Sequence, residues 1–154
     1  MYERILVPLD GSKLAETVLT NVEDIMVKMA PETESEVTLL EVVSGLTYNA
    51  LTRDRRAQVP LEEHELEEVK AEAMAYLNQT AAPLKAKGIK VTTMVAVGDV
   101  AEEIVKAAHE VKANIIAMST HGFSGIKRWA LGSIADRVVK ISDIPTMVIR
   151  AKGG

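Results

Sequence analysis

Two kinds of hydrophobic spacing alternate along the chain. Five short runs are almost continuously apolar and rich in Val and Ile, as expected of parallel strands covered on both faces: residues 5–9, 37–43, 91–97, 115–118 and 146–149. Between them, apolar residues recur at steps of three and four, which predicts helices with one buried face: residues 15–29, 66–84, 101–111 and 134–139. Alternating strands and helices predict parallel strands joined by right-handed crossovers. We therefore expect a single doubly wound α/β domain over residues 1–154, with a five-stranded parallel sheet of order 3-2-1-4-5 and helices on both faces.

Two further features refine this outline. Residues 44–60 show little periodicity, and a segment of this length is usually functional or mobile. Both a flexible connection and a lid over a ligand remain open for it. Helix starts are marked more clearly, because Asp99 with Glu102 and Ser133 with Asp136 have the spacing of a capping box.

Composition and charge narrow the class of function. The chain has 154 residues, a net charge of −4 and a pI of about 5.4, which argues against a broad nucleic-acid-binding surface. Cysteine is absent, which excludes disulfides and thiol chemistry, and three scattered histidines do not favour a zinc site. No apolar run approaches the ~20 residues of a membrane span, and the first residues do not resemble a signal peptide. These observations predict a cytoplasmic protein.

The segment from Ser119 to Ser133 is the strongest candidate for ligand chemistry. It follows the fourth predicted strand, and parallel sheets bind ligands at the carboxyl ends of their strands. Gly122 and Gly132 allow backbone N–H groups to approach an anion. The helix that follows Gly132 adds unpaired N–H groups and a positive dipole end, and the Ser133 hydroxyl can donate to a phosphate oxygen. The segment therefore predicts a site for a di- or triphosphate.

Other named motifs are absent. The chain has no G-x-x-x-x-G-K-[ST] loop and no G-x-G-x-x-G after its first strand. The run from Gly122 to Gly125 is one residue short of a nucleophile elbow, which disfavours Ser124 as a nucleophile. No positioned general base or metal-binding acidic pair is recognisable, so fast phosphoryl transfer is not indicated.

The glycine-rich segment resembles a family signature. Ser119-Thr-His-Gly122, nine residues and then Gly132-Ser133 look like the G-x-x-G-(nine residues)-G-[ST] pattern of the ATP-binding universal stress proteins. Residues 4–12 and 142–149 are similar to that family's opening and closing strands, so the resemblance covers essentially the whole chain. One position departs from the signature, because Ser119 replaces its first glycine.

The resemblance implies ATP with Mg²⁺ as the cofactor and assigns site residues by position. Adenine would be bordered by Pro8, Leu9 and Asp10, with a backbone contact from Val42. The phosphate-holding positions correspond to Ser119, Gly122, Gly132, Ser133 and Ile134, while His121 either contacts a phosphate or fixes the loop. The resemblance also implies a homodimer, and pairing through strand 146–149 would cover an exposed apolar edge.

Several candidate residues also have a plain structural interpretation. Asp10 can cap the first helix together with Ser12. Lys127 and Arg128 can pair with a polyphosphate or can simply be exposed turn residues. Trp129 is more typical of a packing anchor than of a base-stacking platform.

We expect a nucleotide-dependent regulatory or stress-response protein that signals to an unknown protein partner and is at most a slow ATPase. One alternative is an adenylate-chemistry enzyme such as an ATP pyrophosphatase. That group carries Ser-Gly-Gly-x-Asp-Ser after the first strand, where this chain has Asp10-Gly11-Ser12. A third possibility is a dimeric interaction module that binds no nucleotide.

Overall fold

The computed structural model describes residues 3–29, 33–44, 46–48, 58–60, 62–120 and 132–151. Strands and helices alternate along these residues, as the hydrophobic spacing predicts. Their order is β1 Arg4–Leu9, α1 Lys13–Glu16, α2 Val18–Val27, β2 Glu36–Val43, β3 Leu46–Tyr48, β4 Gln58–Pro60, α3 Glu63–Ala86, β5 Val91–Val97, α4 Val100–Glu110, β6 Ile115–Thr120, α5 Ser133–Ile141 and β7 Thr146–Arg150.

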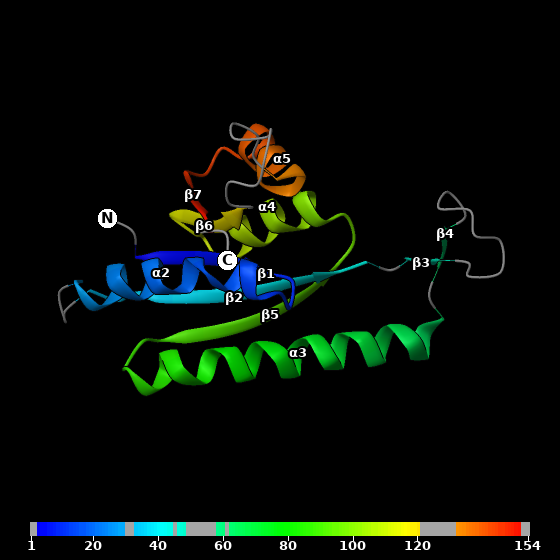
Figure 1. Ribbon diagram of the computed structural model, residues 1–154, viewed down its shortest axis with the longest axis horizontal. Helices are drawn as coiled ribbons and strands as arrows, with labels where there is room; N and C mark the ends of the chain where they lie inside the picture. Colours follow the sequence, from blue (N-terminus) through cyan, green and yellow to red (C-terminus); the bar gives the residue numbers. More distant parts are fainter. Residues whose placement is uncertain are drawn as a thin grey trace.

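The main sheet has five parallel strands in the order β5-β2-β1-β6-β7. Counted among these five strands alone, this is the predicted order 3-2-1-4-5, which is confirmed. Helices α2 and α3 lie on one side of the sheet, and α4 and α5 lie on the other (Figure 1). The chain winds outward from β1 to β2 and β5 and then returns to β6, so the winding direction changes between β1 and β6.

Alternate side chains of each strand enter two separate cores. On one face, Val7 and Leu39 pack with Val22 of α2 and Leu77 of α3. On the other face, strand residues pack with α4 and α5, as Leu6, Leu40, Ile116, Ile104 and Val138 illustrate. Because both faces are covered, the strands read as continuous apolar runs, and the doubly wound arrangement follows from that pattern.

Two details differ from the sequence-based expectations. The helix expected over residues 15–29 is divided at Thr17, whose hydroxyl lies 2.7 Å from the Leu14 carbonyl and offers the backbone an alternative to helical bonding. Residues 44–60 contain the strands β3 and β4, which pair antiparallel as a small second sheet. The expectation of no regular element is wrong there, because three-residue strands are too short to show a period. Residues 45, 49–57 and 61 lie outside the described part, so the flexible loop or lid stays a prediction.

The helix caps confirm the helix start expected at Asp99 and correct the one expected at Ser133. Asp99 is the N-cap of α4 and accepts the Glu102 N–H at 3.1 Å. The cap of α5 is Gly132, and Ser133 is the first helical residue. The expectation of a capping box at Ser133 is therefore wrong, because the cap lies one residue earlier. Gly132 has no side chain, and α5 begins without a side-chain cap bond.

Candidate functional site

The neighbouring strands β1 and β6 pair over only a short stretch. Their register contains Ile5↔Ile115 and Leu6↔Ile116, whereas β1 remains paired with β2 as far as Leu9↔Glu41. Pro8 follows within β1 and offers no N–H to either neighbour. The carboxyl ends of β1 and β6 therefore lie apart where the winding direction changes, which is where open α/β sheets bind ligands.

A cavity of about 450 Å³ lies at these strand ends. Its volume falls within the roughly 300–1,000 Å³ typical of small-molecule sites. Apolar side chains from α4 and β6 form part of its wall, namely Val100, Ile104 and Met118. The cavity also brings together eight of the ten predicted site residues: Pro8, Leu9, Asp10, Val42, Ser119, Gly132, Ser133 and Ile134.

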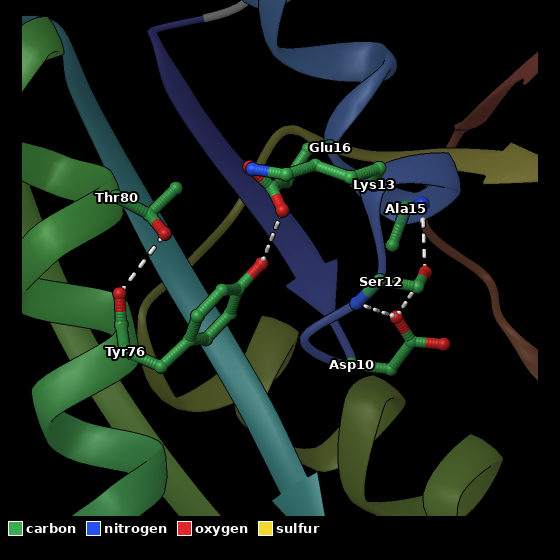
Figure 2. A network of polar contacts seen from close by, with 7 residues as sticks. All are labelled: Asp10, Ser12, Lys13, Ala15, Glu16, Tyr76 and Thr80. Atoms are coloured by element: carbon green, nitrogen blue, oxygen red, sulfur yellow. Dashed lines mark hydrogen bonds and ion pairs between the residues drawn. The ribbon is translucent and has the colours of Figure 1, made fainter.

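The turn from β1 into α1 presents Asp10 at the cavity. Its Oδ1 atom accepts the Ser12 N–H at 2.9 Å and the Ser12 hydroxyl at 2.5 Å, and Ser12 Oγ in turn accepts the Ala15 N–H at 3.1 Å (Figure 2). Gly11 between them has a φ of +84°, a conformation that glycine adopts without strain. Asp10 therefore orients the helix cap, as its structural interpretation predicts. Its described hydrogen bonds all use Oδ1, which leaves Oδ2 for a ligand.

The start of α5 forms a second wall of the cavity. Gly132 donates its N–H to Thr120 Oγ1 at 2.7 Å, and its carbonyl accepts the Asp136 N–H at 2.9 Å. The N–H groups of the first helical turn, from Ser133 to Ala135, have no acceptor within the helix. These residues line the cavity, so a negatively charged group placed there meets backbone donors and the positive end of the helix dipole.

Ser119 lines the cavity, but its hydroxyl is already bonded. It donates to the Ala15 carbonyl at 3.1 Å and lies 2.8 Å from the Thr17 hydroxyl. These contacts tie the end of β6 to the junction of α1 and α2. The serine that departs from the signature glycine thus has a structural role here.

The side chain of Glu41, next to Val42 on β2, points to the opposite face of the sheet from Val42. Glu41 is the register partner of Leu9, and its Oε2 atom is buried without a hydrogen-bond partner among the described residues. Burial raises the pKa of the Glu41 carboxyl above its ordinary value of 4.5, and the nearby charge of Asp10 raises it further. Negative charge on this side would repel an anion, whereas the start of α5 would attract one.

Tyr76 of α3 interacts with two carboxylates, Glu16 and Glu41. Its hydroxyl donates to Glu16 Oε2 at 3.1 Å (Figure 2). Burial raises the pKa of the Tyr76 phenol to about 12, and the hydrogen bond to Glu16 acts in the same direction. Tyr76 therefore stays protonated at neutral pH and holds α1 against α3 as a hydrogen-bond donor.

Some site predictions fall outside the described residues. These are His121 and Gly122, together with Lys127, Arg128 and Trp129, and their roles stay predictions. Sequence reasoning missed Thr120, whose hydroxyl accepts the Gly132 N–H. A hydroxyl residue at the end of a strand, directly before the glycine-rich segment, was the available signal.

Other parts of the described structure offer less for a ligand. Among the residues it covers, no three His, Asp or Glu side chains are grouped to hold a metal ion. A larger hollow of about 580 Å³ lies at the amino ends of the strands, but its Lys87 and Lys90 are paired with Glu23 and Glu36. None of the described helices is both long enough and apolar enough to cross a membrane.

Comparison with known proteins adds independent findings. A model of the Universal stress protein family matches residues 1–150. Universal stress protein YxiE of Bacillus subtilis is 30% identical over 154 residues, covering 97% of this chain and all of the relative. Universal stress protein MJ0577 of Methanocaldococcus jannaschii is 32% identical over 161 residues, covering 99% of this chain and 97% of the relative.

Solved structures agree with these relationships. The structure of MJ0577 matches with a TM-score of 0.75, covering 100% of this chain and 99% of the other. Two structures at 19% identity share the fold: a universal stress protein in complex with cAMP (TM-score 0.66, 97% of both chains) and one from Archaeoglobus fulgidus in complex with dAMP (TM-score 0.63, 96% of this chain and 98% of the other). Sequence, family model and fold agree over nearly the entire length, and the chain belongs to the universal stress protein family.

Proposed function

We propose that this protein binds ATP with Mg²⁺ in the cavity between the ends of β1 and β6 and acts as a cytoplasmic, nucleotide-dependent regulatory or stress-response protein. The observation that carries the proposal is that one cavity contains both halves of the predicted site. Asp10 and Val42 lie at the ends of β1 and β2, and Gly132, Ser133 and Ile134 lie at the start of α5. These residues are far apart in the sequence, and a nucleotide needs both a base pocket and an anion site.

The base would lie toward β1 and β2. Val100, Ile104 and Met118 supply apolar surface for an aromatic ring. The carboxylate of Asp10 can accept a hydrogen bond from the exocyclic amine of adenine through Oδ2. A backbone contact from Val42 would then read the edge of the base.

The phosphates would lie at the start of α5. Ser133 contributes a hydroxyl and a backbone N–H, and Ile134 contributes a second N–H at the positive end of the helix dipole. Gly132 bonds its own N–H to Thr120, so its contribution would be space rather than a donor. Mg²⁺ prefers phosphate and water oxygens to an all-protein cage, so it would enter with the nucleotide.

Catalysis would be slow at most. A fast phosphoryl-transfer enzyme needs a group that positions the attacking water and a cation that neutralises the developing charge. Of the described carboxylates, Asp10 would bind the base, and Glu41 lies on the opposite side of the strand from Val42. Those of Asp99 and Glu102, at the start of α4, are paired with Arg137. Bound nucleotide would therefore act chiefly through its occupancy, as a signal to a partner protein.

A homodimer would complete the proposal. Strand β7 is one edge of the main sheet, and Val139 and Ile141 on the neighbouring α5 are each 46% exposed. Unpaired apolar edges are prone to associate. Sedimentation at micromolar concentration tests this point, and a monomer would contradict it.

Titration with Mg-ATP, Mg-ADP, AMP, cAMP and dAMP tests the binding site. Gly132→Val is a sharp probe because φ at Gly132 is −56°, which valine adopts readily, so the new side chain should block the cavity rather than unfold α5. Gly122→Val tests the other signature glycine, and Lys90→Gln at the opposite end of the strands is the control. We expect both glycine variants to lose Mg-ATP binding and the control to retain it.

The remaining outcomes separate the alternatives. Wild-type protein that binds no adenine nucleotide, or glycine variants that bind as wild type does, would contradict the proposal. A dimer without nucleotide binding would instead favour the interaction module. Overnight analysis of ADP formation distinguishes a nucleotide binder from a slow ATPase.

A further inference from the structure

Arg137 of α5 joins the two helices whose first turns border the cavity. Its Nη1 atom donates to Asp99 Oδ1 and its Nη2 atom donates to Glu102 Oε1, each at 3.0 Å. Asp99 is the N-cap of α4, and its Oδ2 atom accepts the Glu102 N–H at 3.1 Å. The planar guanidinium therefore connects the first turn of α4 with the first two turns of α5, a geometry that Arg provides and Lys does not.

The position of α5 determines the shape of the cavity. Val100 and Ile104 of α4 line it on one side, and Ser133 and Ile134 of α5 line it on another. Their separation is set by how closely the two helices approach. In the described part of the chain, α5 is held to the elements around the cavity by the apolar core, by the Gly132–Thr120 hydrogen bond and by the two hydrogen bonds of the Arg137 guanidinium.

Arg137 also offsets two negative charges at the start of α4, where Val100 lines the cavity. Asp99 is the N-cap of α4 and Glu102 lies in its first turn, and unpaired carboxylates there would repel a polyphosphate. The guanidinium pairs with both of them at once. Its loss would loosen α5 and leave the two charges uncompensated.

The ion pairs are too exposed for fold stability to be their main effect. The side chains of Arg137, Asp99 and Glu102 are 48%, 43% and 65% exposed, and exposed pairs contribute little to stability. Their effect on geometry is different, because a bidentate contact restricts the orientation of one helix relative to the other.

We infer that Arg137 is a positioning residue, which holds the start of α5 at the correct distance from α4 to receive the β- and γ-phosphates of a nucleoside triphosphate. The inference rests on the proposed function, and it names a residue outside the cavity lining and outside the signature motif. It acts through Ser133 and Ile134 and does not itself touch the ligand.

Calorimetric titration of Mg-ATP and AMP against four proteins tests the inference: wild type, Arg137→Gln, Arg137→Lys and Lys140→Gln. Lys140 is a matched control, because it lies on the same helix and pairs with Asp136 within α5 at 2.8 Å, without a link to α4. Arg137→Lys keeps the positive charge but loses the planar guanidinium that bonds to Asp99 and Glu102 at once.

We expect Arg137→Gln to weaken Mg-ATP binding about tenfold, a change of about 1.4 kcal/mol. AMP lacks the β- and γ-phosphates, so its affinity should change less than about twofold. Arg137→Lys should recover only part of the Mg-ATP affinity, and Lys140→Gln should bind as wild type does. Equal Mg-ATP affinity in Arg137→Gln and Lys140→Gln would overturn the inference, as would equal weakening of Mg-ATP and AMP. Wild-type protein that binds no nucleotide would overturn the proposed function as well.

Amide hydrogen exchange on the ligand-free proteins gives a second readout. The Gly132 N–H is bonded to Thr120 at the start of α5. Its exchange should be faster in Arg137→Gln than in Lys140→Gln, because the helix start is less restrained. Identical exchange in the two variants would show that Arg137 does not hold α5, and it would overturn the inference without any nucleotide present.

Discussion

The backbone N–H of Gly132 donates a hydrogen bond to the hydroxyl of Thr120 across 2.7 Å. Thr120 is the last residue of β6 and only 2% exposed, and Gly132 is the N-cap of α5. The bond therefore sets where the helix begins relative to the end of the strand. Because Ser119 is bonded in turn to Ala15, the end of β6 is tied to helices on both sides of the sheet.

Thr120→Val tests how much this hydrogen bond contributes to stability and to nucleotide binding. Valine keeps the shape of threonine but has no acceptor, so the Gly132 N–H loses its partner at a cost of about 1–3 kcal/mol. We expect lower stability in urea denaturation and weaker Mg-ATP binding, because α5 is no longer held at the end of β6. Thr120→Ser keeps the hydroxyl and is the control for binding. Equal Mg-ATP affinity in the two variants would count against this account.

Ser119→Gly restores the family's signature glycine and tests what the serine does. The Ser119 hydroxyl bonds to Ala15 and lies beside Thr17, so its loss should destabilise the protein by about 1 kcal/mol. The added backbone freedom of glycine costs a further 0.5–1 kcal/mol or so. Mg-ATP affinity should change less than about twofold. Ser119→Ala separates the hydroxyl from the backbone effect, and a large gain in affinity for Ser119→Gly would show that the serine obstructs the ligand.

Glu41→Gln should change how stability depends on pH. The pKa of Glu41 is raised by burial and by Asp10, so the folded protein favours the neutral carboxyl. That contribution is fully present below the unfolded pKa, near 4.5, and is lost as pH rises through the raised pKa of the folded state. Glutamine is neutral throughout, so the variant should be more stable than wild type at pH 7 and should approach it as pH falls toward 4.5.

The surroundings of Glu41 make this direction specific. Among the described residues, the ionisable groups shown to interact with it are Asp10 and Tyr76, and neither is a cation. Glu36→Gln, on the same strand but paired with Lys90, is the matched control, and it should show no such gain at pH 7. Chemical denaturation across this pH range measures both variants. A Glu41→Gln protein less stable than wild type at pH 7 would show that the carboxylate has a partner that compensates its burial.

Gly11→Ala tests the turn that presents Asp10. The φ of Gly11 is +84° and nothing lies within 4 Å of an added Cβ, so the cost is backbone strain alone, about 1–2 kcal/mol. Gly88 has nearly the same φ, +83°, and equally open surroundings at the other end of the strands. Both alanine variants should lose similar stability in thermal denaturation. Only Gly11→Ala should weaken nucleotide binding, and equal affinity in both variants would contradict the role of the turn.

Hydrophobic spacing was sufficient for the main architecture, because its signal repeats many times within each element. The continuous apolar run of residues 37–43 reflects burial on both faces, with Leu39 in one core and Leu40 in the other. The same logic fails for β3 and β4, each of which has only three residues. It also missed the division of the first helix at Thr17, where one hydroxyl competes with the helical bonding.

The site was predictable where a motif marks it and less so where distant residues cooperate. Gly132 and Ser133 were indicated by glycine spacing and Asp10 by the family resemblance, and all three line one cavity. The link from Arg137 to Asp99 spans 38 positions, and no local pattern indicates it. Such contacts depend on how α4 and α5 pack, which is settled only when the sheet has formed.

The short pairing of β1 with β6 also bears on what a nucleotide in the cavity would do. The ladders of β5, β2 and β1 form one block, and those of β6 and β7 form a second. The described hydrogen bonds between β1 and β6 lie toward the amino ends of the strands, at Ile5 and Leu6 and between Arg4 and Asn114 just before β6. A nucleotide bound to Asp10 on one side and Ser133 on the other would bridge this seam. Because the nucleotide would contact both blocks, it would restrict their relative movement. The protein should therefore be harder to unfold when ATP is abundant.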